Sequence, residues 1–145
     1  PDHVLAKPGK LDVDEFRVMQ RHTEIGAFIL RHDNFFDLAR EVAYSHHERW
    51  DATGYPQGRP ASEYSLLTRI VSVVDVFDAM ISKRPYKEPW PPEKPIAAIR
   101  AGSGTQFDPQ VVAAFVALYG RGELNAIIAS TTEPPGARAS DGLLC

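Results

Sequence analysis

The chain has 145 residues, of which 43% are hydrophobic and 24% charged, a composition typical of one globular domain. Its net charge of −3 disfavours a non-specific binder of nucleic acid polymers, because such proteins usually carry a basic excess. The single cysteine, Cys145, excludes a disulfide framework within the chain and favours a cytoplasmic location. No apolar run approaches the roughly 20 residues that span a bilayer.

The first helix is expected to begin just after Asp12. Asp12 is followed three residues later by Glu15, a spacing typical of a capping box. Apolar residues then recur at helical spacing on a stripe that also contains His22. The segment LDVDEFRVMQRHTEIGAFILRH is therefore predicted to form a helix.

A second helix is expected over about 35–49, where two neighbouring apolar stripes end in His46 and His47. Gly54 and Pro56 then predict a loop, because glycine and proline interrupt helices.

A third helix is expected over about 63–83. Its β-branched run 70–74 is also consistent with a buried strand, but the length of the apolar segment favours a helix. Asp75 and Asp78 recur at helical spacing within it.

The rest of the chain predicts two more helices and a tail. A short helix is expected over 93–100. Asp108 followed by proline is a good N-cap for a helix over 109–120. The segment 130–145 is rich in Pro, Gly, Ala and Ser and is expected to be a disordered tail. The sequence thus predicts an all-α domain over 1–129.

Three of the five histidines, His22, His46 and His47, lie on apolar stripes. Burial disfavours a charged imidazole and leaves a neutral ring that can bind metal. Neighbouring residues in a helix diverge by about 100°, so His46 and His47 are expected to point apart and to serve two ions. Asp75 or Asp78 could bridge such ions, and this ligand chemistry suits iron, manganese or zinc. The alternatives remain open that the histidines satisfy hydrogen bonds in the core and that the aspartates face solvent or join helices.

Several motifs resemble the HD-GYP domain family. HHERWDATGYP is similar to its signature HHExxDGxGYP. KPGKLDVDEF and MQRHTEIG resemble the stretch between the family's HD motif and its next ligand histidine. IVSVVDVFDAMISKRPYK and GTQFDPQVVAAF resemble the segments that follow the signature. The resemblance covers about residues 4–120, with the motifs in the family's order.

The resemblance implies an HD-type helical bundle that holds two or three divalent metal ions, often iron or manganese. It implies a phosphodiesterase that hydrolyses cyclic di-GMP within a two-component or other bacterial signalling protein. Asp75 is selected over Asp78 as a ligand, since it is the first aspartate of the matching segment. The metal ligands implied by motif are His22, His46, His47 and Asp75.

The resemblance also implies a substrate site. Arg84 and Lys87 match contacts to the substrate phosphate, although SKRPYK taken by itself reads as a solvated cationic turn. The implied catalytic group is water bound by the metal ions. Glu48 is expected either to orient a ligand histidine or to form a surface salt bridge. The loop that lines the site matches Gly54, Tyr55 and Pro56.

Two departures from the family pattern are present. Ala52 stands where the family has glycine, so the loop would be strained if this position needs a positive φ. The family's HD dyad is expected before Pro1, and the chain is therefore interpreted as the C-terminal portion of the domain, without its first helices. Apolar residues of the second and third helices are then expected to be exposed.

The sequence is consistent with two kinds of function, catalysis and binding. The alternative to an enzyme is a catalytically inactive HD-GYP module for nucleotide binding or for contact with diguanylate cyclase (GGDEF) domains. An HD dyad just before Pro1 in the parent protein would favour catalysis, and its absence would favour the binding module. An N-terminal regulatory domain and a homodimer are further expected partners.

Overall fold

The structure, a computed structural model, describes residues 4, 7, 9–82 and 90–132. Within these ranges every regular element is a helix and no strand is formed, apart from an isolated bridge between Ser103 and Phe107. The predicted all-α fold class is confirmed. None of the helices in this part of the chain is long and apolar enough to cross a membrane.

Helix α2 spans Val13–Ile29 and begins where the sequence predicts. The Asp12 carboxylate accepts hydrogen bonds from the N–H groups of Asp14 and Glu15, and the Glu15 carboxylate accepts one from the N–H of Asp12. This reciprocal pattern is a capping box, which satisfies N–H groups that lack a partner in the first turn of a helix.

Helix α3 spans Asp37–Ser45, packs against α2, and follows a short 3₁₀ helix, η1 (Asn34–Phe36). The predicted second helix continued to Arg49, so its C-terminal end was placed four residues too late. The chain leaves the helix at His46, whose ring donates to carbonyl oxygens of the last turn. The Ser72 hydroxyl donates to the carbonyl oxygen of His46 at 2.6 Å. These two contacts replace the hydrogen bonds that would extend the helix.

Helix α4 spans Leu66–Ile81 and begins after Ser65, whose hydroxyl accepts from the N–H of Thr68. A separate 3₁₀ helix, η2 (Ala61–Glu63), occupies the region where the predicted third helix began. The run 70–74 lies inside α4, so the alternative of a buried strand is wrong.

Helix α5 spans Glu93–Ala101 and α6 spans Pro109–Gly120, close to the predicted ranges. Asp108 caps α6 as predicted, accepting from the N–H of Gln110 at 2.7 Å. Helix α7 (Asn125–Thr132) was not predicted, and it runs past the expected start of the tail at 130. The rest of that tail lies outside the described residues.

The hydrophobic core lies between α4, α5 and α6, and Leu124 and Ile128 from the α7 segment pack against it. Ile99 and Val73 are completely buried at its centre. The core side chains are Val73, Phe77, Ile81, Ile96, Ile99, Phe107, Val111, Val112 and Phe115.

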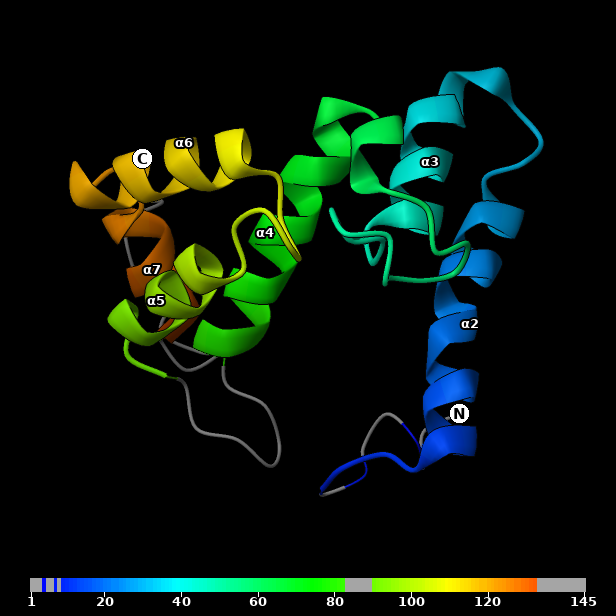
Figure 1. Ribbon diagram of the computed structural model, residues 1–145, viewed down its shortest axis with the longest axis horizontal. Coiled ribbons are helices and arrows are strands. Elements are labelled where there is room, and N and C mark those ends of the chain that lie inside the picture. Colours follow the sequence, from blue (N-terminus) through cyan, green and yellow to red (C-terminus); the bar gives the residue numbers. More distant parts are fainter. Residues whose placement is uncertain (1–3, 5–6, 8, 83–89, 133–145) are drawn as a thin grey trace, which may run out of the picture.

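The α2–α3 side of the molecule buries much less. Figure 1 shows α2 and α3 to one side of α4, with α5, α6 and α7 on the other side. In α2 the one fully buried residue is Thr23. Large apolar side chains on η1, α3 and α4 are exposed, which confirms the expectation from the sequence. They are Phe35, Phe36, Leu38, Leu66, Leu67, Ile70 and Val74.

Candidate metal centre and its loop

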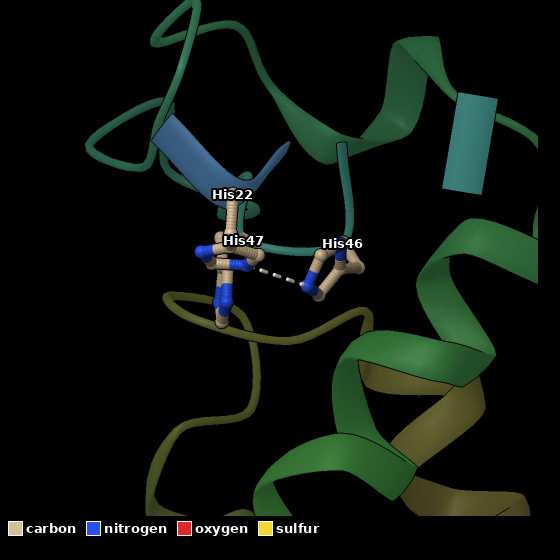
Figure 2. A group of neighbouring side chains, drawn as sticks. All are labelled: His22, His46 and His47. Atoms are coloured by element: carbon tan, nitrogen blue, oxygen red, sulfur yellow. Dashed lines mark hydrogen bonds between the residues drawn. The ribbon is translucent and has the colours of Figure 1, made fainter. Parts of the chain in front are cut away.

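Three histidines from two places in the chain meet beside the end of α3. His22 comes from the middle of α2, while His46 and His47 follow directly after α3. One potential ligand atom from each of the three lies within 4.8 Å of the others, and Figure 2 shows the three side chains gathered together, with a dashed line joining His22 and His46. His22 is exposed, and His46 and His47 are half-buried.

Backbone carbonyl groups fix the protonation of two of these rings. Nδ1 of His22 lies 2.6 Å from the carbonyl oxygen of Met19, and Nδ1 of His46 lies 3.0 Å from that of Val42. Because a carbonyl oxygen only accepts hydrogen bonds, each Nδ1 carries the proton of its neutral ring. Nε2 of both rings is then left with a free lone pair.

The two Nε2 atoms of His22 and His46 lie 3.3 Å apart. Two lone pairs at this distance repel each other unless a cation or an extra proton lies between them. Two imidazole nitrogens bound to one metal ion, each at about 2.0–2.1 Å, are separated by roughly 3–3.4 Å at tetrahedral or octahedral angles. The donor set therefore fits a metal ion.

Burial first, and then the neighbouring His46 and His22, lower the pKa of His47 to about 4. A lowered pKa means that the His47 ring is neutral at neutral pH, which is the form that binds metal. His47 is thus ready to act as a ligand without first losing a proton.

The structure corrects two expectations about the histidines, namely that they could be buried in the core and that His46 and His47 point apart. None of the three is a fully buried core residue. His46 and His47 also do not point apart, since their ring centroids are 4.2 Å apart with 40° between the planes. The 100° argument assumed a continuing helix, but α3 ends at Ser45 and the chain turns at the two histidines.

The loop after the histidines folds back onto them. Tyr55 stacks on His47 with ring centroids 4.7 Å apart and 28° between the planes, and its N–H donates to the His47 carbonyl oxygen. A Cβ atom on Gly54 would lie 2.5 Å from that same oxygen, so only glycine allows this close approach. Pro56 is half-buried and follows Tyr55 in the same loop.

Ala52 has a φ of 61°. This value lies in the left-handed region, where glycine avoids the strain that a Cβ introduces. The conditional expectation from the family pattern is confirmed, because the position requires a positive φ and the chain carries alanine there.

Glu48 does not form the surface salt bridge that was one of its two expected roles, and it does not contact a histidine directly through a hydrogen bond among the described contacts. Its side chain is buried, with 2% of the residue exposed, which excludes a surface salt bridge. Its carboxylate accepts hydrogen bonds from the backbone N–H groups of Gln57 and Arg59. Among the contacts of the described residues, no hydrogen bond joins Glu48 to a histidine.

A cavity of about 300 Å³ adjoins the histidines and this loop. Sequence reasoning missed several residues in its walls, including Phe16 and Gln20 on α2 and Ser72 on α4. Ser72 had one signal, which is its place as a small polar residue inside an apolar run, three positions before Asp75. Arg49 also lines the cavity, and hydrogen bonds first from Arg49 and then from Thr53 hold the pKa of Asp51 well below its usual range.

The remaining predicted site residues lie either on α4 or outside the described residues. Asp75 is exposed on α4 and is not a member of the histidine group. Burial first, and then the negative charge of Asp75, raises the pKa of Tyr55 to about 12. Asp78 accepts a hydrogen bond from the Ser82 hydroxyl at 3.1 Å. Arg84 and Lys87 lie outside the described residues.

Known proteins with similar sequences carry phosphodiesterase names. The chain is 47% identical over 120 residues to a cyclic di-GMP phosphodiesterase of Thermotoga maritima, covering 81% of this chain and 33% of that protein. It is 46% identical over 129 residues to a cyclic di-GMP phosphodiesterase response regulator of Xanthomonas campestris, covering 88% and 34%. It is 41% identical over 114 residues to 3′3′-cGAMP-specific phosphodiesterase 2 of Vibrio cholerae, covering 77% and 22%. The chain thus spans about a third or less of the length of these relatives.

A solved structure shows the same fold. The crystal structure of a cyclic GMP-AMP specific phosphodiesterase of V. cholerae matches with a TM-score of 0.63 at 20% identity, covering 94% of this chain and 37% of that chain. The HD domain family matches residues 1–111. With most of its length matched, the chain belongs to the HD domain family, which confirms the predicted relationship to the HD-GYP type.

Proposed function

We propose that this chain is part of a metal-dependent phosphodiesterase that hydrolyses cyclic di-GMP in the bacterial cytoplasm. The observation that carries the proposal is the pair of Nε2 atoms of His22 and His46, 3.3 Å apart, with both Nδ1 atoms held by carbonyl oxygens. The names of the relatives support cyclic di-GMP as the substrate.

His22, His46 and His47 would hold a divalent metal ion, and Asp75 is proposed by motif as a further ligand. Iron or manganese is the expected metal, in a centre of two or three ions. A metal bound here would stabilise negative charge on a phosphodiester and would acidify water. The carbonyl contacts to both Nδ1 atoms keep the rings oriented while their Nε2 atoms bind.

Other residues of the chain would hold the substrate. Tyr55 is a neutral phenol at physiological pH, and burial first and then the charge of Asp75 raise its pKa further, to about 12. Its hydroxyl can therefore donate a hydrogen bond to a phosphate oxygen. Arg84 and Lys87 are proposed to contact the phosphate, with Arg84 offering a planar fork for two oxygens. Gly54 and Pro56 are proposed to shape the loop that carries Tyr55.

The test is hydrolysis of cyclic di-GMP by the chain extended at its N-terminus to include the segment in which the HD dyad is expected, with Mn²⁺ or Fe²⁺, followed by chromatography of the products. We expect turnover that a chelator abolishes and that His46→Ala abolishes together with metal binding. A parallel assay with 3′3′-cGAMP tests the second substrate named among the relatives. Metal-loaded protein that hydrolyses neither dinucleotide would contradict the proposal.

Binding of cyclic di-GMP without turnover would instead favour the regulatory module. In that case the loop that carries Tyr55 would be the contact surface for diguanylate cyclase domains. Those domains, an N-terminal regulatory domain and a second copy of the chain stay predictions.

A further inference from the structure

Glu48 is a buried carboxylate beside the metal centre with no part in the proposed reaction. It follows directly after His46 and His47, yet its side chain turns away from them toward the loop. We propose that Glu48 is a positioning residue that holds Tyr55 against His47 and thereby orients a metal-binding ring. This inference rests on the proposed function only in taking His47 as a metal ligand.

The Glu48 carboxylate holds the returning segment of the loop through two hydrogen bonds. Oε1 accepts from the N–H of Gln57 at 2.6 Å, and Oε2 accepts from the N–H of Arg59 at 3.2 Å. With 2% of Glu48 exposed, water does not readily replace either bond. Removing the carboxylate would leave backbone N–H groups without a partner, which is unfavourable in a protein interior.

The loop closes around Glu48 from both sides. Its entry is fixed where Gly54 approaches the backbone of 47–49, since a Cβ there would lie 2.6 Å from the Cα of Glu48. Its exit is fixed where the N–H of Ala61 donates to the carbonyl oxygen of Arg49 at 2.9 Å. The Glu48 side chain ties down the segment between these two points.

Tyr55 is the part of the loop that reaches the metal centre. Its ring stacks on His47 at 4.7 Å between centroids, and its N–H donates to the His47 carbonyl oxygen at 3.3 Å. No described hydrogen bond fixes a ring nitrogen of His47, whereas carbonyl oxygens fix the rings of His22 and His46. The plane of His47 is therefore restrained by its neighbouring rings, of which Tyr55 is the most nearly parallel, while His46 lies 4.2 Å away at 40°.

A carboxylate suits this role better than an amide. Two N–H donors converge on Glu48, and a carboxylate offers an acceptor oxygen to each of them. Glutamine has the same shape but offers one acceptor, and its NH₂ group would face the second N–H. Glu48→Gln therefore removes one of the two bonds with little change in volume.

The experiment measures Co²⁺ binding by the d–d absorption spectrum, which reports ligand geometry and needs no turnover. We expect Glu48→Gln to weaken Co²⁺ binding about 10-fold, within the range seen when groups that orient metal ligands are altered, and to change the spectrum. Amide exchange at Gln57 and Arg59 should become faster. Glu63→Gln is the matched control, because Glu63 lies in η2 with its side chain 45% exposed and pairs only with Arg59 among the ion pairs described.

A double-mutant comparison separates positioning from general stability. Tyr55→Ala should weaken Co²⁺ binding by a similar factor, and adding Glu48→Gln to it should weaken binding no further. If Glu48→Gln does not fold, Tyr55→Ala alone still decides, since it leaves both Glu48 hydrogen bonds in place. Unchanged Co²⁺ affinity and spectrum in Tyr55→Ala would overturn the inference.

Other outcomes also decide. A lower melting temperature for Glu48→Gln with unaltered Co²⁺ binding would show a purely structural role and overturn the inference. Wild-type protein that binds Co²⁺ but hydrolyses no cyclic dinucleotide would contradict the proposed function and leave the role of Glu48 intact. Wild-type protein that binds no Co²⁺ would overturn both.

Discussion

At the scale of single residues, Ala52 is the clearest compromise in the chain. Its φ of 61° costs an alanine about 1–2 kcal/mol, whereas glycine loses roughly 0.5–1 kcal/mol through its more flexible unfolded state. We expect Ala52→Gly to stabilise the protein by about 0.5–1 kcal/mol, measured by urea unfolding. Ala98→Gly on the exposed face of α5 is the control and should destabilise by about 1 kcal/mol.

Arg84 is the residue proposed to grip the substrate phosphate, and its replacement tests that role. Arg84→Lys keeps the charge but loses the planar fork. In the chain extended at its N-terminus to include the expected HD dyad, we expect turnover of cyclic di-GMP to fall by roughly 10-fold, about 1.4 kcal/mol of transition-state stabilisation. Arg84→Ala should lower it further. Metal content should not change, because arginine is not a ligand, whereas His46→Ala should lose both. Full activity in Arg84→Ala, or loss of its metal, would rule out the assigned role.

The histidine cluster shows what single residues can and cannot reveal in sequence. The family motif predicted that His22, His46 and His47 share a metal site, and the structure places their ligand atoms close together. The direction of His46 and His47 could not be predicted, because it depends on where α3 ends. That end is set by contacts from elsewhere in the fold, among them the hydrogen bond from Ser72. The hydrogen bonds of Glu48 were unpredictable for the same reason.

At the scale of helices, local signals predicted starts better than ends. Asp12 and Asp108 cap α2 and α6 as expected, because a cap depends on residues two or three positions away. Helix α7 has no comparable signal at its start. It is held by apolar packing of Leu124 and Ile128 against a core formed by distant segments, which a local pattern does not reveal.

Asp108 links α4 to α6. Its side chain is 2% exposed, forms an ion pair with Arg69 of α4 at 2.6 Å, and caps α6. Breaking a buried pair costs about 3–5 kcal/mol and losing a cap about 1 kcal/mol. We expect Asp108→Ala to destabilise by roughly 3–4 kcal/mol in urea unfolding, with Asp108→Asn destabilising less because it keeps the cap.

Asp12→Ala is the matched control for Asp108→Ala. Asp12 caps α2 in the same way but is exposed, and it should cost about 1 kcal/mol. An equal effect of Asp12→Ala and Asp108→Ala would mean that the pair with Arg69 contributes little.

At the scale of the whole molecule, burial is uneven. The α4–α6 core is closed, while the end of α2 exposes Phe28 and Ile29 at 61% and 68%, and η1 exposes Phe35 at 85%. Exposed apolar area of this kind favours association. We expect light scattering to show self-association that increases with concentration. The double variant Ile29→Ser with Phe35→Ser should reduce it, whereas Val13→Ser, at the far end of α2, should not. A monodisperse monomer at all concentrations would contradict this prediction.

Ala52 has a consequence at the level of the gene. Alanine and glycine codons differ only at their second base, so one point mutation separates the strained loop from a relaxed one. Under selection for heat resistance in the laboratory, a glycine at this position should therefore be among the earliest changes to appear. If selection for activity retains alanine instead, the strain at the turn beside the histidines serves the reaction.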